Sequence, residues 1–211
     1  MKLIHNFKSP NFNDRKSNNI EIIVIHYTAL SSISSSLKNL CSKKNKVSSH
    51  YLISQEGKIY SLVSEKKRAW HAGQSYWRGS TDINSISIGI ELDFSPLDIN
   101  NKFTLKLNTA LIFLLTKLIK KYRISNENIL GHSDISPYRK IDPGKYFPWQ
   151  ILENKKLSYR PQFLNRSDIK NNLNKEWLNK NKLNSKKKKI LFMLNFIGYD
   201  TSLALKNKIY F

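Results

Sequence analysis

The sequence predicts a mixed α/β domain with a central β-sheet flanked by helices, followed by a small C-terminal helical domain. Two short runs of β-branched and apolar residues, 21–28 and 84–92, are typical of buried strands. Residues 102–122 carry an amphipathic pattern, which predicts a helix of about five turns that packs across one face of the sheet. Strands that alternate with helical segments favour a layered α/β arrangement.

Length and composition are typical of a globular protein with one main domain. With 211 residues, of which 40% are hydrophobic, the chain can bury one core and carry a small appendix. Beyond Trp149 the sequence becomes polar and rich in Lys and Asn, so we expect a catalytic-type domain at 1–158 and a small helical domain at 159–211. The single cysteine, Cys41, excludes a disulfide framework and a Cys-rich structural zinc site.

The formal net charge of +21 raises nucleic acid as a partner. However, the lysines are spread through the whole chain, and only Lys186 to Lys189 form a run, which is typical of a solvated helix start. We find neither a nucleic-acid reading element nor a segregated basic face, so we expect no nucleic-acid partner. The basic surface would still attract an anionic polymer.

Membrane and export signals are weak in this sequence. No stretch reaches the ~18 apolar residues of a membrane span. The N-terminal residues lack the apolar core that a secretory signal requires. The chain as given is therefore expected to be cytoplasmic and a monomer, with a periplasmic or exported location left open.

The first predicted strand, EIIVIHYT at residues 21–28, ends beside His26. This histidine is either a buried side chain satisfied by a carbonyl or a functional group.

Residues 37–41 have helical spacing and predict a short helix that crosses over the sheet. Residues 50–54 and 58–63 alternate apolar and polar side chains around a Gly-containing turn, which predicts a β-hairpin.

A loop rich in aromatic residues follows the hairpin. It has the sequence RAWHAGQSYWRG, residues 68–79, and contains two tryptophans, a tyrosine and His71. Aromatic side chains on loops often form a ligand wall. Alternatively, Trp70 and Trp77 only cover the core.

The second predicted strand, NSISIGIEL at residues 84–92, contains an acidic residue near its end. A carboxylate in an apolar strand is costly unless it is paired or used, so we assign Glu91 a functional role. Gly89 marks a point where a backbone or a ligand could approach closely.

The segment GHSDISPYRKIDPG, residues 131–144, holds a dense group of polar side chains. Its two prolines exclude a regular helix or strand, so we expect a shaped loop. A neutral imidazole from His132 and a carboxylate from Asp142 suit Zn²⁺, which keeps one position open for water when it is catalytic. The strand end would supply His26 as the third ligand, and Lys140 adds a cation. The alternative is a capping Asp and a His bonded to the backbone.

Five segments of the chain, in this order and spacing, resemble the type 2 N-acetylmuramoyl-L-alanine amidases, zinc enzymes related to peptidoglycan recognition proteins. They are VIHYTA, SSHYLIS, AWHAG, SIGIEL and GHSDISPYRKIDPGKYFPW. The resemblance implies hydrolysis of the amide bond between the muramoyl lactyl group and L-alanine of peptidoglycan or anhydro-muropeptides. The alternative is a recognition protein of the same fold that binds muropeptide without cutting it. Such a protein would typically lack a ligand or the catalytic pair.

The resemblance also assigns roles to residues. It implies that Zn²⁺ is bound by His26, His132 and Asp142, with Glu91 as the proton-transfer carboxylate and Lys140 as the oxyanion-stabilising lysine. Four side chains are expected to contact the glycopeptide: Tyr27, His50, Trp70 and His71. The tail resembles, more weakly, a three-helix peptidoglycan-binding module, chiefly through FIGYDTSLAL, and its last helix looks degenerate.

Overall fold

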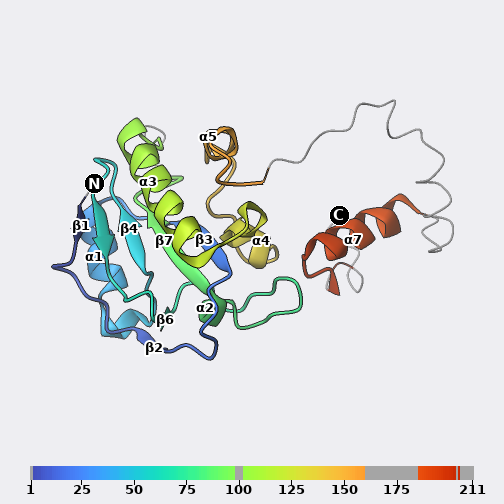
Figure 1. The fold of residues 1–211 in the computed structure, drawn as a ribbon, viewed down its shortest axis with the longest axis horizontal. Helices are drawn as coiled ribbons and strands as arrows, with labels where there is room; N and C mark the ends of the chain where they lie inside the picture. Colours follow the sequence, from blue (N-terminus) through green and yellow to red (C-terminus); the bar gives the residue numbers. More distant parts are fainter. Residues whose placement is uncertain (1, 98–101, 160–184, 203, 205–211) are drawn as a thin grey trace.

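A six-stranded mixed sheet with the strand order β1-β5-β4-β7-β3-β8 organises the chain (Figure 1). The computed structural model describes residues 2–97, 102–159, 185–202 and 204. The strands of this sheet are β1 (Leu3–Ile4), β3 (Ile22–Tyr27), β4 (Tyr51–Ile53), β5 (Ile59–Ser61), β7 (Ser87–Leu92) and β8 (Ile129–Gly131). A second, two-stranded sheet pairs β2 (Phe12–Asp14) with β6 (Lys67–Ala69). The predicted mixed α/β fold is confirmed.

Strands β7, β3 and β8 are neighbours that run parallel, and their C-terminal ends lie on the same side of the sheet. β3 pairs in parallel with β7 and with β8. In this register His26 lies opposite Glu91, and β8 leads directly into His132. Parallel sheets collect functional groups at the carboxyl ends of their strands. The pairing therefore gathers three predicted site residues at one edge.

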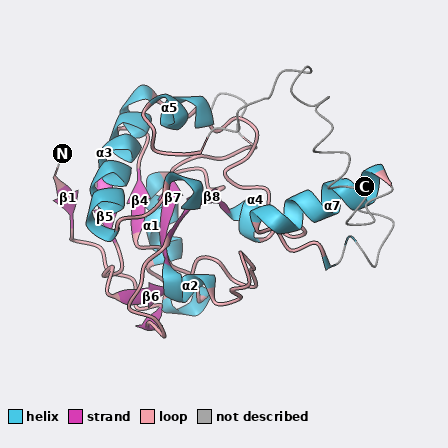
Figure 2. Cartoon of the chain, turned by 45° about the vertical axis from the view of Figure 1, so that its right-hand side comes forward, coloured by secondary structure: helices cyan, strands magenta, loops and turns pink. Residues whose placement is uncertain are grey.

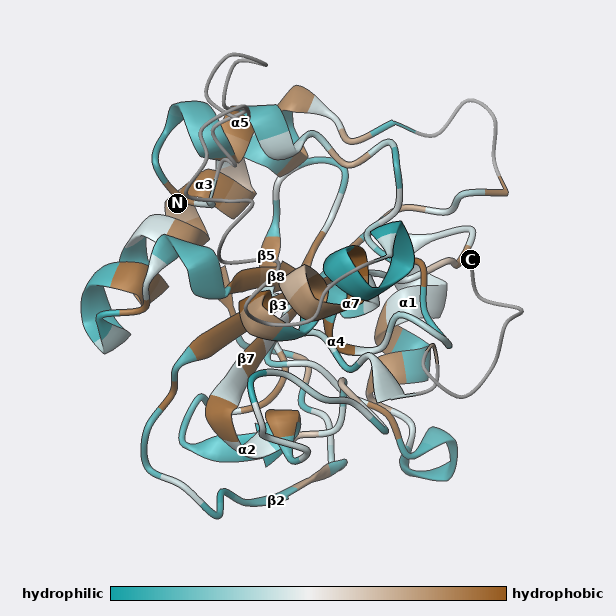
Figure 3. Cartoon of the chain, turned by 90° about the vertical axis from the view of Figure 1, so that its right-hand side faces the viewer, coloured by the Kyte–Doolittle hydropathy of each residue, from teal (hydrophilic) through white to brown (hydrophobic). Residues whose placement is uncertain are grey.

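Helices cover both faces of the sheet, as the nearly continuous apolar runs of β3 and β7 require. Ile23 and Ile25 of β3 pack in the cluster under α3, whereas Ile22 and Val24 pack in a second cluster on the opposite face. This alternation is the period-two pattern of a strand that is buried on both sides. Figure 3 shows the apolar strands at the centre of the fold.

The long helix α3 (Leu105–Tyr122) begins and ends at recognisable caps. The Thr104 hydroxyl accepts a hydrogen bond from the Leu107 N–H, and Arg123 adopts a left-handed conformation at the C-terminus. The other helices are α1 (Ile33–Leu40), α2 (Ile83–Ile86), α4 (His132–Ile135), α5 (Trp149–Asn154) and α7 (Lys186–Ile197), with 3₁₀ turns η1 (Lys43–Asn45) and η2 (Asn126–Asn128). No helix among the described residues is long and apolar enough to span a bilayer.

Two local predictions were wrong. The expected strand at residues 84–92 begins later, because residues up to Ile86 form the single turn α2. The segment after Gly131 begins with the helical turn α4 rather than with an irregular loop. This turn ends at Ile135, two residues before Pro137, a place where proline is compatible with a helix end.

The C-terminal part is described only in pieces. Helix α7 falls within the predicted small helical domain at 159–211, and Gly198, with φ of 136°, follows its last residue. Residues 160–184, 203 and 205–211 of that predicted domain lie outside the described residues. In Figures 1 and 2, α7 lies on the side of α4. The division into two domains stays a prediction.

Candidate functional site

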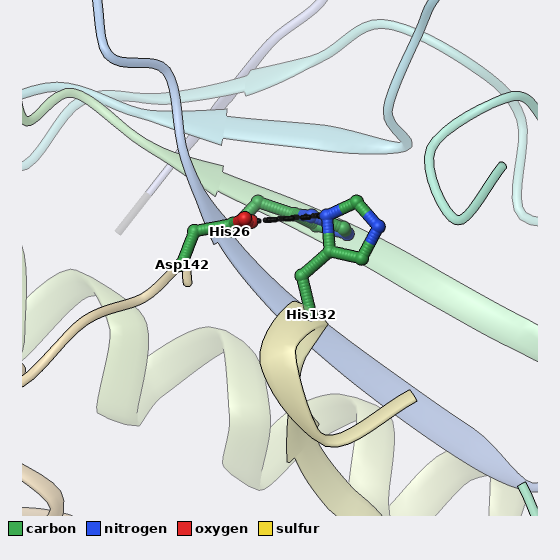
Figure 4. Close-up of side chains that lie close together, drawn as sticks. All are labelled: His26, His132 and Asp142. Carbon is green, nitrogen blue, oxygen red and sulfur yellow. Dashed lines mark hydrogen bonds and ion pairs between the residues drawn. The ribbon is translucent and has the colours of Figure 1, made fainter. Parts of the chain in front are cut away.

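Three buried side chains converge at the C-terminal edge of the sheet (Figure 4). The Nδ1 atoms of His26 and His132 lie 3.0 Å apart, and Asp142 Oδ2 lies 3.1 Å from each of them. They come from the end of β3, the first residue of α4 and the loop that follows α4. Two ligands of a tetrahedral ion with bonds of about 2.0–2.1 Å would lie about 3.3 Å apart, so the spacing fits a small metal ion.

The protonation states at this cluster also fit a metal. Burial, and then the neighbouring His132, lower the pKa of His26 to about 4, so this ring is neutral at pH 7. Burial opposes ionisation of Asp142, but its contacts with the two histidines outweigh burial and lower its pKa below the usual value. The His132 Nε2–H donates to the carbonyl of Ala72 at 3.0 Å, which leaves a lone pair on Nδ1. Neutral imidazoles and a carboxylate are the states that zinc binds.

Glu91 supplies a second, differently tuned carboxyl group. Burial, and then the negative charge of Asp142, raise its pKa to about 8, while Lys140 lowers it. Its Oε2 atom is inaccessible and has no hydrogen-bond partner among the described residues. Buried polar atoms normally have a hydrogen-bond partner, so this unpaired oxygen is available to bind a ligand.

Lys140 lies close enough to influence both sides of the site. It lowers the pKa of His26 and the pKa of Glu91, and in each case its effect is smaller than that of burial. The residue is half-buried on the loop between α4 and Asp142. A cation in this place can stabilise negative charge that develops between Glu91 and the three-residue cluster.

Tyr27 lies near the cluster, whereas Trp70 lies beside the small sheet. The half-buried Tyr27 packs on Phe94 with 5.7 Å between ring centroids, and a Cβ added at Gly144 would lie 3.4 Å from its Cε1 atom. Burial and Asp142 raise its pKa, so it lies near the cluster. The half-buried Trp70 donates its indole N–H to Asn13 at 2.9 Å, next to the small sheet.

His50 lies in the interior of the fold. It is fully buried. Its Nδ1 accepts from the Gly89 N–H at 3.0 Å, and its Nε2 lies 3.0 Å from the Lys67 carbonyl oxygen. Burial, and then Arg15, lower its pKa to about 3. Both ring nitrogens are thus bonded inside the core, and the expected substrate contact of His50 stays a prediction.

His71 lies behind a candidate ligand. Its Nδ1 lies 3.0 Å from His26 Nε2, and the residue is only 9% exposed. The sequence analysis expected it to contact glycopeptide, but the structure places it against the far side of the His26 ring. The sequence analysis did not identify Ser87, whose hydroxyl contacts His71 Nε2 at 3.2 Å. A serine at the start of a strand carries no signal of such a role.

Comparisons with known proteins identify the family of this chain. The family model described as N-acetylmuramoyl-L-alanine amidase matches residues 16–145. The chain is 40% identical over 164 residues to N-acetylmuramoyl-L-alanine amidase AmiD of Escherichia coli K12, a match that covers 67% of this chain and 55% of AmiD. It is 43% identical over 106 residues to 1,6-anhydro-N-acetylmuramyl-L-alanine amidase AmpD of Haemophilus influenzae, covering 50% and 56%. The chain thus spans about half the length of these relatives.

Solved structures show the same fold. E. coli AmiD in complex with anhydro-N-acetylmuramic acid-L-Ala-D-γ-Glu-L-Lys superposes with a TM-score of 0.71 at 33% identity, covering 89% of this chain and 76% of that one. Pseudomonas aeruginosa AmpDh3 in complex with anhydromuramic pentapeptide gives 0.72 at 29% identity, covering 86% and 74%. The family model covers more than half of the chain and includes all five predicted metal and catalytic residues. This chain belongs to the N-acetylmuramoyl-L-alanine amidase family.

Proposed function

We propose that this chain is a zinc-dependent amidase that cleaves the bond between the lactyl group of N-acetylmuramic acid and L-alanine. The observation that carries the proposal is the triangle of donor atoms with edges of 3.0 and 3.1 Å, next to a carboxyl group with a raised pKa. Family membership supports the reaction. The muropeptides bound to AmiD and AmpDh3 support anhydro-muramyl peptides, or the peptidoglycan from which they derive, as the substrate class.

The metal would be held by His26, His132 and Asp142, a donor set of two nitrogens and one oxygen that suits Zn²⁺. When bound, zinc polarises a carbonyl group and lowers the pKa of a water molecule. The chain contributes the orientation of these ligands. The Ala72 carbonyl accepts from His132 Nε2, which turns the Nδ1 lone pair towards the other two donors.

Glu91 and Lys140 perform the proton and charge chemistry. Glu91 takes a proton from the attacking water and delivers it to the L-alanine nitrogen as the amide bond breaks. A pKa of about 8 lies near neutral pH, where a group can both accept and donate a proton. Lys140 stabilises the negative charge that develops on the carbonyl oxygen.

Substrate contacts are assigned to the two predicted aromatic residues that remain partly exposed. Tyr27 lies near Asp142 and packs on Phe94, so its ring would contact the part of the substrate closest to the scissile bond. Trp70 lies farther along the chain, where its half-buried ring would contact a sugar ring or the stem peptide.

The test is an assay of amide cleavage together with a measurement of zinc content. Purified protein should contain about one zinc per chain and should release peptide with a free L-alanine amino group from anhydro-muramyl tripeptide. Glu91→Gln should keep the zinc and lose about 10²–10⁴ in kcat. Binding of muropeptide without any cleavage by zinc-loaded wild-type protein would instead support the recognition-protein alternative and refute the proposal.

A further inference from the structure

A chain of hydrogen bonds runs from His26 into the interior of the protein. His26 Nε2 lies 3.0 Å from His71 Nδ1, and His71 Nε2 lies 3.2 Å from the Ser87 hydroxyl. The Ser87 hydroxyl in turn donates to the carbonyl oxygen of Ile83 at 2.6 Å. All three polar side chains are buried, so the protons in this chain do not exchange freely with water.

The Ile83 carbonyl group, at the end of this series of hydrogen bonds, fixes the direction of every bond in it. A carbonyl oxygen can only accept, so the Ser87 proton is committed to Ile83 and the Ser87 oxygen accepts from His71 Nε2–H. The buried His71 ring packs against the imidazoles of His26 and His50 and contacts no carboxylate among the described residues, so nothing there would stabilise a second proton on it. With its proton on Nε2, its Nδ1 can only accept, and the donor must be His26 Nε2–H. The Nδ1 atom of His26 is then left with a lone pair that faces His132 and Asp142.

The His71 ring is held in place from several sides. A Cβ atom added at Gly89 would lie 2.4 Å from His71 Cγ, so the strand β7 has room for this ring only because residue 89 is glycine. The backbone N–H groups of His71 and Ala72 both donate to Asn84 Oδ1, at 3.0 and 2.8 Å. The ring therefore has little freedom to turn away from His26.

Two consecutive residues thus orient both histidines of the cluster. His71 contacts Nε2 of His26, and the carbonyl of its neighbour Ala72 accepts from Nε2 of His132. Partners on the outer nitrogen of a ligating histidine set its tautomer and its orientation. The same segment therefore presents both Nδ1 atoms to the same point.

We propose that His71 is a positioning residue that holds His26 as its Nε2–H tautomer, with the Nδ1 lone pair ready for the metal, and that it does not act as a substrate contact. The inference rests on the proposed zinc site. It deepens that proposal by assigning to the histidine of the AWHAG segment a role in metal affinity.

The first experiment reads the tautomer directly. Long-range ¹H–¹⁵N NMR spectra of the metal-free wild-type protein should show His26 protonated at Nε2 and unprotonated at Nδ1 near pH 7. The same spectra of His71→Leu, which removes the acceptor, should show a mixture of tautomers. Protonation of wild-type His26 at Nδ1 would overturn the proposal, whether or not the protein binds zinc.

The second experiment measures zinc affinity by competition with a chromophoric chelator. His71→Leu should bind zinc about 10- to 100-fold more weakly. His71→Asn should restore most of the affinity, because the Asn Oδ1 can accept from His26 in place of the imidazole Nδ1. His50→Leu is the matched control, since it removes another buried imidazole that does not contact a ligand, and it should leave the affinity of the folded protein unchanged.

The outcomes separate this inference from the proposed function. If folded His71→Leu binds zinc as tightly as wild type, the positioning role is refuted while the amidase proposal stands. An equal loss of affinity in His50→Leu would also refute it, because the effect would then follow from general destabilisation. If wild-type protein binds no zinc, the proposed function fails, and the tautomer spectra alone decide the role of His71.

Discussion

Replacing Glu91 by Gln in the metal-free protein tests whether the fold holds this carboxyl group neutral. Burial and the nearby Asp142 raise the pKa of Glu91 from 4.5 to about 8. Between these two pH values the unfolded chain releases the proton and the folded chain keeps it. The free energy of unfolding therefore falls by up to about 1.4 kcal/mol for each pH unit across this window. Gln has a similar shape and no titration, so the variant should not show this loss.

The magnitude follows from the width of the window. At pH 7 the pH lies 2.5 units above the ordinary pKa of 4.5 (7 − 4.5), and 2.5 units correspond to about 3 kcal/mol. This value is a ceiling, because Glu91 retains some exposed surface and solvent screens its charge. We expect Glu91→Gln to be more stable than wild type by about 1–3 kcal/mol at pH 7, relative to the difference between them at pH 4.

Urea denaturation of chelator-treated proteins at pH 4, 5.5, 7 and 8.5 provides the measurement. The advantage of Glu91→Gln should grow from pH 4 to pH 8 and then level off. Glu21→Gln, which removes an exposed carboxylate just before β3, is the control and should show no such trend. A constant difference between Glu91→Gln and wild type at all four pH values would show that the carboxyl group is not held neutral.

Four further substitutions test the site. Asp142→Ala should lose zinc in elemental analysis, because two remaining ligands hold the metal too weakly. Lys140→Ala should retain zinc and lower kcat by about 10²–10³ in the cleavage assay, through lost oxyanion stabilisation. Gly89→Ala should lower the free energy of unfolding by about 1–3 kcal/mol in urea, because its Cβ would lie 2.4 Å from His71 Cγ. Trp70→Ala should raise KM at unchanged zinc content, whereas a collapse of the fold would instead assign Trp70 to the core.

The main features of the fold could be predicted because they follow from local periodicity. The apolar runs of β3 and β7 and the helical pattern of α3 are each visible in the sequence alone. The start of β7 was misplaced because Ile86 continues the alternation of Ile88 and Ile90, which favours a strand, whereas its spacing of three residues from Ile83 suits one turn of helix. Only the tertiary contacts of Ile83 with the second core cluster distinguish the two.

The cluster of His26, His132 and Asp142 could be predicted, but the environment of the other histidines could not. His26 stands at the end of a predicted strand and His132 in the dense polar segment 131–144, and the resemblance implied that they meet. His50 and His71 occur in equally polar motifs, and their burial depends on Gly89, which accommodates the His71 ring and donates its N–H to His50. The local sequence around each histidine does not show which ring packs against a glycine that lies far away in the sequence.

The C-terminal segment makes contacts with residues 131–144 that the sequence did not reveal. The Tyr199 hydroxyl donates to Asp134 Oδ1 at 2.5 Å, and Asp134 Oδ2 accepts from the Gly131 N–H at 2.7 Å. The Tyr138 hydroxyl donates to the Asp200 carbonyl at 3.0 Å. The tail thus contacts two positions of the segment that carries His132.

The two carboxyl groups of the site differ in protonation because their neighbours differ. Asp142 contacts two imidazoles, which lower its pKa, so it stays ionised and is suited to be a permanent ligand. Glu91 lies in the same pocket without a hydrogen-bond partner at Oε2 among the described residues, and the charge of Asp142 raises its pKa further. The ionisation of one carboxyl group opposes the ionisation of the other, so one electrostatic interaction favours both proposed roles, Asp142 as ligand and Glu91 as proton carrier. Removing the charge of Asp142 should therefore lower the pKa of Glu91 as well as abolish metal binding.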